Sequence, residues 1–153
     1  MKRFILLLLC LFCATMAAAG NNKGNKDQES GAVGAMRSIK TAQKWYAKTY
    51  PQEGFACKLD TLGSGKTSDV PSAEHAGLLD SSLSAGTVRN GYLFAVSCSG
   101  SDKPSQHYRS TATPTEKSMT AFCSDETGVI RSIAGKDVAS CFEKGQDIQN
   151  PSK

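Results

Sequence analysis

The cysteines constrain the fold of this chain more than any other feature. Six occur in the 153 residues, and two of them lie in an apolar run near the N-terminus. The other four are Cys57, Cys98, Cys123 and Cys141. An even number of cysteines in a small exported chain predicts disulfides, because oxidising compartments let these bonds persist. Whether these four cysteines form disulfides therefore depends on whether the N-terminus is an export signal.

The first residues are typical of a secretory signal peptide. Lys2 and Arg3 precede the apolar run Phe4–Met16, and three alanines then lead to Gly20. This order of a basic region, an apolar region and small residues predicts a signal peptide over residues 1–19, cleaved after Ala19. We therefore expect an extracytoplasmic protein, either periplasmic or secreted.

The competing interpretation is a membrane anchor, for which the apolar run is short. Phe4 to Ala19 spans 16 residues, whereas a helix needs roughly 20 to cross a bilayer. Cys10 follows Leu9 and Cys13 follows Phe12, so neither cysteine has the small preceding residue of a lipoprotein acylation site. We expect no stable transmembrane segment after cleavage, and retention of residues 4–19 as an anchor remains the alternative.

The four remaining cysteines allow three pairings. We favour Cys57 with Cys98 and Cys123 with Cys141, because the second pair brackets one local hairpin and the first must then reach across the fold. In the chain-entropy model the Cys123–Cys141 bond stabilises by about 3 kcal/mol and the longer loop by about 4 kcal/mol. Free buried thiols and a zinc site are the alternatives, but no Cys-x-x-Cys or Cys/His spacing supports zinc.

Composition divides the chain into four parts. Cleavage removes two of the 18 basic residues, so the mature chain has 16 basic and 14 acidic residues. Its length is typical of one domain. Residues 20–30 contain no apolar side chain and predict a flexible linker. A globular domain is expected over residues 31–141, and a flexible C-terminal tail over residues 142–153.

One long amphipathic helix is predicted over residues 31–50. Its apolar positions recur with helical spacing, and Pro51 ends the pattern. Trp45 projects away from the apolar face, and a cationic stripe occupies the neighbouring arc at spacings of three and four. The stripe comprises Arg37, Lys40, Lys44 and Lys48. These residues and Trp45 are the candidate contacts for a partner or a polyanion, while a solvated helix face is the simpler interpretation.

The rest of the domain is predicted to be a long loop followed by strands. Residues 52–84 are rich in Gly, Ser and Asp, and we expect short helical turns near 71–77 and 80–83. Alternating patterns predict strands over four later segments, the last two joined by a tight turn at Asp125–Gly128. These segments are 91–98, 106–113, 118–124 and 128–133. The expected fold class is α+β, with the helix packed on a four-stranded antiparallel sheet.

Several segments in this order resemble the globular head of bacterial type IV pilin-like proteins, including the pseudopilins of type II secretion. They lie within about residues 31–141: Ile39–Pro51, Gly54–Cys57, Gly77–Asp80, Gly91–Phe94, Thr111–Pro114 and Phe122–Arg131. The resemblance implies a long helix packed on an antiparallel sheet, a variable connecting loop and a C-terminal disulfide loop.

The N-terminus departs from that family. Its members have a short basic leader ending in Gly, then a processed Phe-Thr-Leu-x-Glu start and a hydrophobic half-helix that anchors the subunit. Here Gly20 is followed by Asn21 and Asn22, and the apolar run precedes the predicted cleavage site. Prepilin processing and ordinary filament polymerisation are therefore not expected, and the resemblance implies a pilin head without its anchor.

No catalytic constellation is evident in the sequence. His75 and His107 are its two histidines, and no Gly-x-Ser-x-Gly motif accompanies them. Asp125 and Glu126 suit an exposed turn better than a calcium site, which needs six or more oxygen ligands. We therefore expect no enzyme, cofactor or metal site. The leading hypothesis is a binding or assembly module that contacts a pilus or secretion-system protein, and the alternative is a secreted binder of an anionic polymer such as DNA or cell-surface glycan.

Overall fold

The computed structural model describes residues 17–65, 70–100 and 102–149, with side chains from Lys23 onward. Most of the predicted signal peptide, including Cys10 and Cys13, lies outside the described residues. None of the helices in the described part of the chain is both long and apolar enough to cross a membrane.

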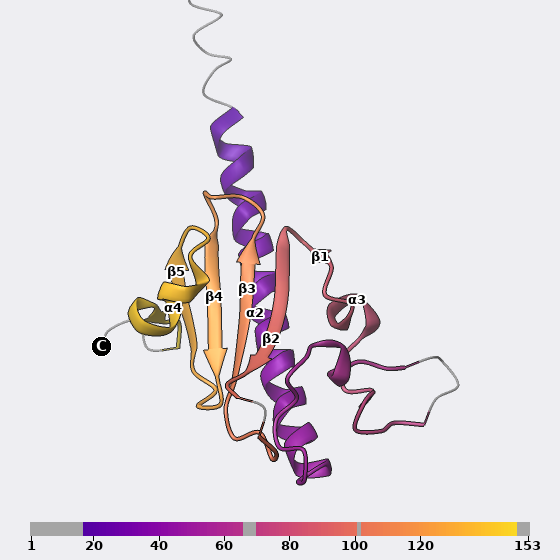
Figure 1. Cartoon of the computed structure of the whole chain (residues 1–153). Helices are drawn as coiled ribbons and strands as arrows, with labels where there is room; N and C mark the ends of the chain where they lie inside the picture. The colour runs from indigo at the N-terminus through magenta and orange to yellow at the C-terminus, as the bar shows by residue number, and fades with distance from the viewer. Residues whose placement is uncertain (1–16, 66–69, 101, 150–153) are drawn as a thin grey trace, which may run out of the picture.

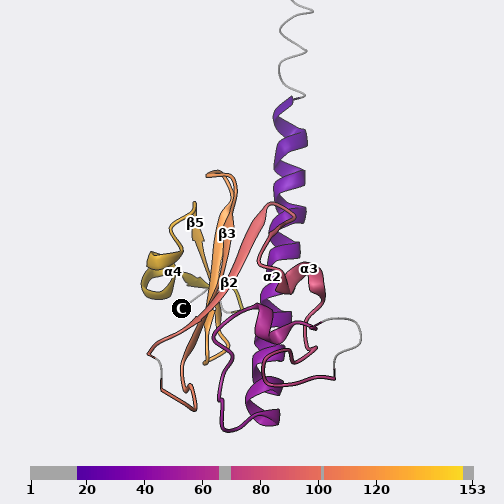
Figure 2. The same cartoon turned by 45° about the vertical axis from the view of Figure 1, so that its right-hand side comes forward.

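The fold class is α+β, as predicted. A 33-residue helix, α2, comes first and a sheet follows it along the chain (Figure 1). Figure 2 shows α2 on one side of the sheet and the short helix α4 on the other. The elements in chain order are α2 (Ala17–Thr49), η1 (Asp60–Leu62), α3 (Ser81–Ser84), β1 (Val88–Arg89), β2 (Tyr92–Cys98), β3 (Tyr108–Pro114), β4 (Thr120–Asp125), β5 (Ile130–Ala134), α4 (Val138–Lys144) and β6 (Gln146–Asp147).

The sheet has six antiparallel strands in the order of the sequence, rather than the four expected. The four predicted strands correspond to β2–β5. The two additional strands, β1 and β6, are two residues long and lie at the edges, where only one neighbour pairs with them. Segments this short carry no alternating pattern, so neither edge strand could be predicted from periodicity.

The apolar face of α2 forms one side of the core. Ala32, Met36 and Ile39 are buried against the sheet, with Ala42 and Tyr46 continuing the same face. These positions recur every three or four residues, which places them on one side of a helix. From the sheet, aromatic side chains at alternate positions of β2 and from β4 complete the core.

Residues 20–30 are helical, which corrects the expectation of a flexible linker. They continue α2, and the sheet holds the last part of this segment: the Thr120 N–H donates a 2.9 Å hydrogen bond to Glu29 Oε1. Extending an existing helix needs no new nucleation, so a polar sequence can be helical when a packed segment follows it. The earlier turns of α2 extend beyond the sheet in both views (Figures 1 and 2).

The segment between α2 and the sheet contains short helical turns, but only one is where we expected it. α3 agrees with the predicted turn near 80–83, and Asp80 caps it by accepting the Leu83 N–H. The turn predicted over 71–77 is wrong. Ser72 Oγ accepts the N–H groups of Glu74 and His75 there, and the single 3-10 turn of this segment as described lies at η1.

The C-terminal segment is ordered through Gln149, which corrects the expected tail from residue 142. Asp137 caps α4 by accepting the Ser140 N–H, and β6 then pairs with β5. Ile148 donates its N–H to Ile130 O at 3.1 Å and packs against the core. Residues 150–153 lie outside the described residues.

Both predicted disulfides are present. Cys57–Cys98 joins the segment after α2 to the end of β2, with its Cα atoms 4.8 Å apart. Cys123–Cys141 joins β4 to α4, with its Cα atoms 6.0 Å apart. The sequence separations are 41 and 18 residues. The first bond links the connecting segment to the sheet, and the second links α4 to the sheet.

The polar side chain of Gln43 lies inside the core. Gln43 is fully buried on α2, where its Nε2 donates to Ala56 O at 2.8 Å and its Oε1 accepts the Ala56 N–H at 2.9 Å. The two bonds hold the start of the connecting segment against the helix. A buried backbone group left without a partner costs about 1 to 3 kcal/mol.

We predict that Gln43→Leu lowers the free energy of unfolding by about 3 kcal/mol, because both backbone groups of Ala56 lose their partner. Urea unfolding followed by circular dichroism measures the change. Gln52→Leu is the matched control, since Gln52 is exposed just after the helix and should change stability by less than about 0.5 kcal/mol. Equal stability of the two variants would contradict the role assigned to Gln43.

Candidate functional site

The structure divides the predicted cationic stripe into two parts. Arg37, Lys44 and Lys48 are exposed along α2. Lys40 instead turns toward the sheet, is half-buried, and donates from Nζ to Gly128 O at 3.2 Å. Three of the four cations therefore remain on the open face, and the fourth ties the helix to the β4–β5 turn.

A shallow groove runs beside the three exposed cations. Trp45 is 53% exposed and Leu78 is 37% exposed, and both line this groove of about 350 Å³. Lys48 Nζ lies 5.1 Å from the centre of the Trp45 ring, a cation–π distance. The groove also contains Arg37, Ser38, Thr41 and Ala42. We name these residues together with Lys44 and Lys48 the helix face.

The helix face is positive and has no acidic residue of its own. From Ser30 to Gln52 the sequence has no Asp or Glu, whereas it has four Lys or Arg residues. Leu78 contributes from the connecting segment, which was not predicted to lie at this face. Only its place in the folded chain identifies it, because a single leucine in a loop has no periodic signal.

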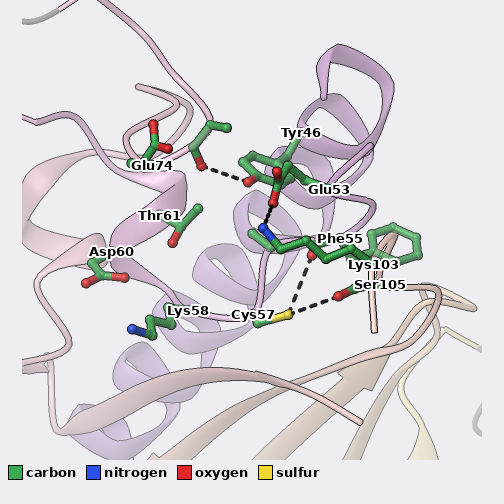
Figure 3. Close-up of a pocket in the computed structure, with 12 residues that line it drawn as sticks. Tyr46, Glu53, Phe55, Cys57, Lys58, Asp60, Thr61, Glu74, Lys103 and Ser105 are labelled. Atoms are coloured by element: carbon green, nitrogen blue, oxygen red, sulfur yellow. Dashed lines mark hydrogen bonds and ion pairs between the residues drawn. The ribbon is translucent and has the colours of Figure 1, made fainter. Parts of the chain in front are cut away.

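A second, more polar pocket of about 370 Å³ lies between α2 and the connecting segment (Figure 3). Tyr46 lines this pocket, and its hydroxyl donates a 2.7 Å hydrogen bond to Ala73 O. Burial and the nearby Glu53 and Glu74 raise the pKa of Tyr46. Lys103 forms an ion pair with Glu53 across the opening.

Among the described residues that line the polar pocket, no serine is paired with a histidine base. Ser105 Oγ lies 3.3 Å from Cys57 Sγ, and no histidine is among the described residues that line the pocket. A serine nucleophile needs an adjacent base to become reactive. Within the described parts of the chain, no group of three or more His, Cys, Asp or Glu side chains is placed to hold a metal ion.

The acidic turn between β4 and β5 is held by its own contacts. Gly128 donates its N–H to Asp125 O at 2.9 Å, and its φ of 75° is one that glycine adopts without strain. Arg131 Nη1 lies 3.1 Å from Asp125 Oδ2. Burial pushes the pKa of Asp125 upward, but hydrogen bonds from Thr127 and Arg131 outweigh it and lower the pKa below its usual value.

Among the described contacts, the ring of His107 is paired with a carboxylate and with no serine. His107 Nδ1 lies 2.7 Å from Glu126 Oε1, and both side chains reach solvent. Burial acts to raise the pKa of Glu126, while its contacts with His107 lower it more strongly. Tyr108, beside this turn, has its pKa raised to about 12 by burial and by the neighbouring carboxylates. In this hairpin the charged side chains of Asp125 and Glu126 are therefore paired with Arg131 and His107.

The lowered pKa of Asp125 gives a stability prediction with a defined sign. Its contribution is present above the pKa of the unfolded chain and is lost as pH falls through the lower folded pKa. We predict that Asp125→Asn lowers the free energy of unfolding by about 1 kcal/mol at pH 7. The difference from the unmodified protein should shrink as pH falls from about 5 to about 2.

Urea unfolding at several pH values measures this difference. Glu143→Gln is the control, because Glu143 is exposed on α4 and has no ion pair among the described residues. A destabilisation by Asp125→Asn that stays constant down to pH 2 would show that the charge of Asp125 is not its cause.

The surfaces described here are the helix face, the polar pocket and the acidic hairpin. The helix face combines an exposed aromatic ring with three exposed cations, the pocket is polar, and the charges of the acidic hairpin contact one another. No protein family model, no curated protein and no solved structure matches this chain.

Proposed function

We propose that the protein is an extracytoplasmic, non-catalytic binding or assembly module of the pilin-like kind, associated with a type IV pilus or type II secretion apparatus. The observation that carries the proposal is the arrangement of a long helix, a connecting segment, an antiparallel sheet and a C-terminal disulfide in this order. This is the arrangement that the sequence resemblance implies. Two disulfides are compatible with a location outside the cytoplasm.

The N-terminal part of α2 supports a role in assembly. The described residues before Gln28 lie along turns that extend past the sheet (Figures 1 and 2) and are mostly exposed. The side chains of Gln28 and Glu29 reach the end of the sheet, at Gly91 and Thr120. The polar turns form a stalk that projects from the folded part of the chain.

The helix face is the surface that we assign to the partner. Its exposed Trp45 is a rigid aromatic side chain, and aromatic residues and arginine are the types that most often dominate binding energy at interfaces. Large exposed apolar side chains gather at this groove from two segments distant in sequence, Trp45 from α2 and Leu78 from the connecting segment.

Site-specific photocrosslinking in the native host tests this function. A photoreactive phenylalanine at Trp45 or Leu78 should give crosslinked products that mass spectrometry identifies as pilus or secretion-system proteins. The same residue at Glu116, in the β3–β4 connection, is the control and should not give them. Identical products from all three positions, or products that include no envelope component, would overturn the proposal.

A second function is favoured by the charge of the helix face. Arg37, Lys44 and Lys48 are exposed beside an exposed aromatic ring, with no acidic residue from 30 to 52. Cations that neutralise a polyanion and a ring on which bases or sugars can stack are the two components of a site for an anionic polymer. The alternative proposal is therefore a secreted binder of DNA or of an anionic cell-surface glycan.

We predict that, if this alternative holds, a fluorescent single-stranded oligonucleotide or heparin binds with an affinity that falls steeply with salt. Replacing Arg37, Lys44 and Lys48 with glutamine should lower the slope of log affinity against log salt by up to about 2 for single-stranded DNA. Fluorescence anisotropy at several salt concentrations measures the slope.

The matched control replaces Lys26, Lys117 and Lys144, which are equally exposed but lie outside the helix face. It removes the same charge and should leave most of the slope in place. Equal losses in the two triple variants would mean that net charge, rather than the helix face, causes the binding.

A further inference from the structure

We propose that Cys57–Cys98 is a thiol-exchange site that a dithiol reductant opens in the native protein, while Cys123–Cys141 stays closed. The inference does not depend on the proposed function. It rests on how differently the two disulfides are placed. Thiol–disulfide exchange requires a thiolate to reach one sulfur atom, so access decides which bond reacts.

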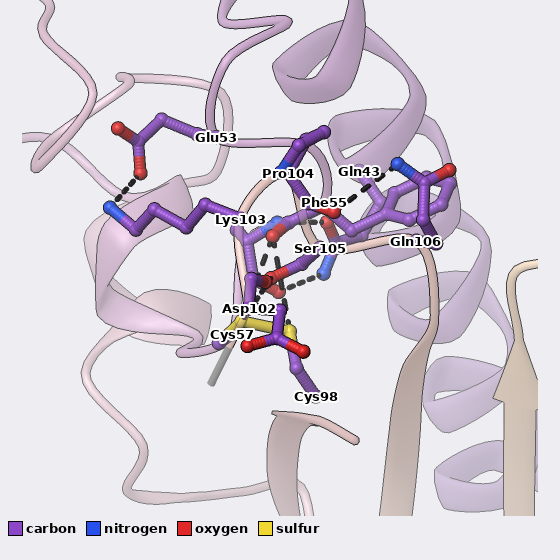
Figure 4. The surroundings of a disulfide bond; sticks show 11 residues. Gln43, Glu53, Phe55, Cys57, Cys98, Asp102, Lys103, Pro104, Ser105 and Gln106 are labelled. Atoms are coloured by element: carbon purple, nitrogen blue, oxygen red, sulfur yellow. Dashed lines mark hydrogen bonds and ion pairs between the residues drawn. A yellow bond between two sulfur atoms is a disulfide. The ribbon is translucent and has the colours of Figure 1, made fainter. Parts of the chain in front are cut away.

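The Cys57–Cys98 disulfide lies at the surface. Cys57 is exposed and lines the polar pocket, and Cys98 is half-buried at the end of β2. Figure 4 shows the bond among the side chains of the connecting segment and of residues 102–106. A reductant that enters the polar pocket therefore meets Cys57 first.

The Cys123–Cys141 disulfide is enclosed. Both cysteines are 0% exposed, between β4 and α4. Gly145 closes over the bond so tightly that a Cβ there would lie 3.2 Å from Cys141 Sγ and 2.9 Å from Arg131 Cβ. Reaching this bond requires α4 to leave the sheet.

The surroundings of Cys57 suit the exchange step. Ser105 Oγ lies 3.3 Å from Cys57 Sγ, so its hydroxyl can donate a hydrogen bond to a thiolate that forms there. Lys58 and Lys103 line the same pocket, together with Glu53, Asp60 and Glu74. The pocket is thus polar and carries charges of both signs, and the exposed Cys57 lines it, within reach of a water-soluble dithiol.

The reaction proceeds in two exchanges. A thiolate of the dithiol attacks Cys57 Sγ, the Cys57–Cys98 bond breaks, and Cys98 leaves as a thiolate that takes a proton from water. The second thiol, as its thiolate, then attacks the reductant's own sulfur in the mixed disulfide and releases Cys57, which is protonated in turn. The protein disulfide is reduced to two thiols and the dithiol is oxidised to a disulfide.

Several hydrogen bonds besides the disulfide hold the fold near the bond. Phe55 donates its N–H to Ser105 O at 2.9 Å, and Ser105 donates its N–H to Glu53 O at 2.8 Å. Gln43 holds Ala56 by the two hydrogen bonds described above. These contacts keep Cys57 beside Cys98 after reduction, so we expect the opening to be local and reversible.

Partial reduction of the native, oxidised protein tests the proposal. The full mature chain is incubated with dithiothreitol, quenched with iodoacetamide at intervals, digested and analysed by mass spectrometry. Cys57 and Cys98 should be alkylated at least about tenfold faster than Cys123 and Cys141, because access controls the rate. The far-UV circular dichroism should not change during the fast phase.

Urea below the unfolding transition separates local attack from global unfolding. The rate at Cys57–Cys98 should be nearly independent of urea, whereas the rate at Cys123–Cys141 should rise with it, because larger openings expose more surface. The double variant C123S/C141S should keep the fast rate and C57S/C98S should lose it. Equal rates at the two disulfides, or a Cys57–Cys98 rate that follows global unfolding, would overturn the proposal; if either variant does not fold, the urea dependence of the unmodified protein decides.

Discussion

The contact between the apolar side of α2 and the sheet is the interaction on which the rest of the structure depends. Met36 and Ile39 are completely buried there, and the helix has no other apolar face to satisfy. The same contact leaves Arg37, Lys44 and Trp45 on the outside, because residues one position away on a helix point in different directions. The positive helix face is therefore a consequence of how the core is built.

Much of this fold could be predicted from periodicity. The amphipathic pattern identified the packed part of α2, alternation identified β2–β5, and the placement of Cys123 and Cys141 around one hairpin indicated the correct pairing. The predictions failed for segments whose secondary structure depends on contacts with neighbouring elements. Residues 20–30 are polar but continue a packed helix, and Gln146–Asp147 form a strand only because β5 offers an edge.

The candidate site was less predictable than the fold. The helical spacing of Lys40 placed it in the cationic stripe, yet its side chain reaches the carbonyl of Gly128, 88 residues away. Leu78 joins Trp45 only through the folding of the connecting segment. Spacing along one helix specifies which side chains share a face, but not which of them a distant segment will engage.

The hydrogen bond between Glu29 and Thr120 has a mechanical consequence. It fixes α2 to the start of β4 at the point where the helix leaves the sheet, and the helix runs along the strands (Figure 1). A force applied to the N-terminal turns along the helix axis therefore acts parallel to the helix–sheet contact, where many side-chain contacts resist it together. A head built in this way resists tension along its stalk by shear, whereas a force across the sheet would separate the two-residue edge strands one at a time.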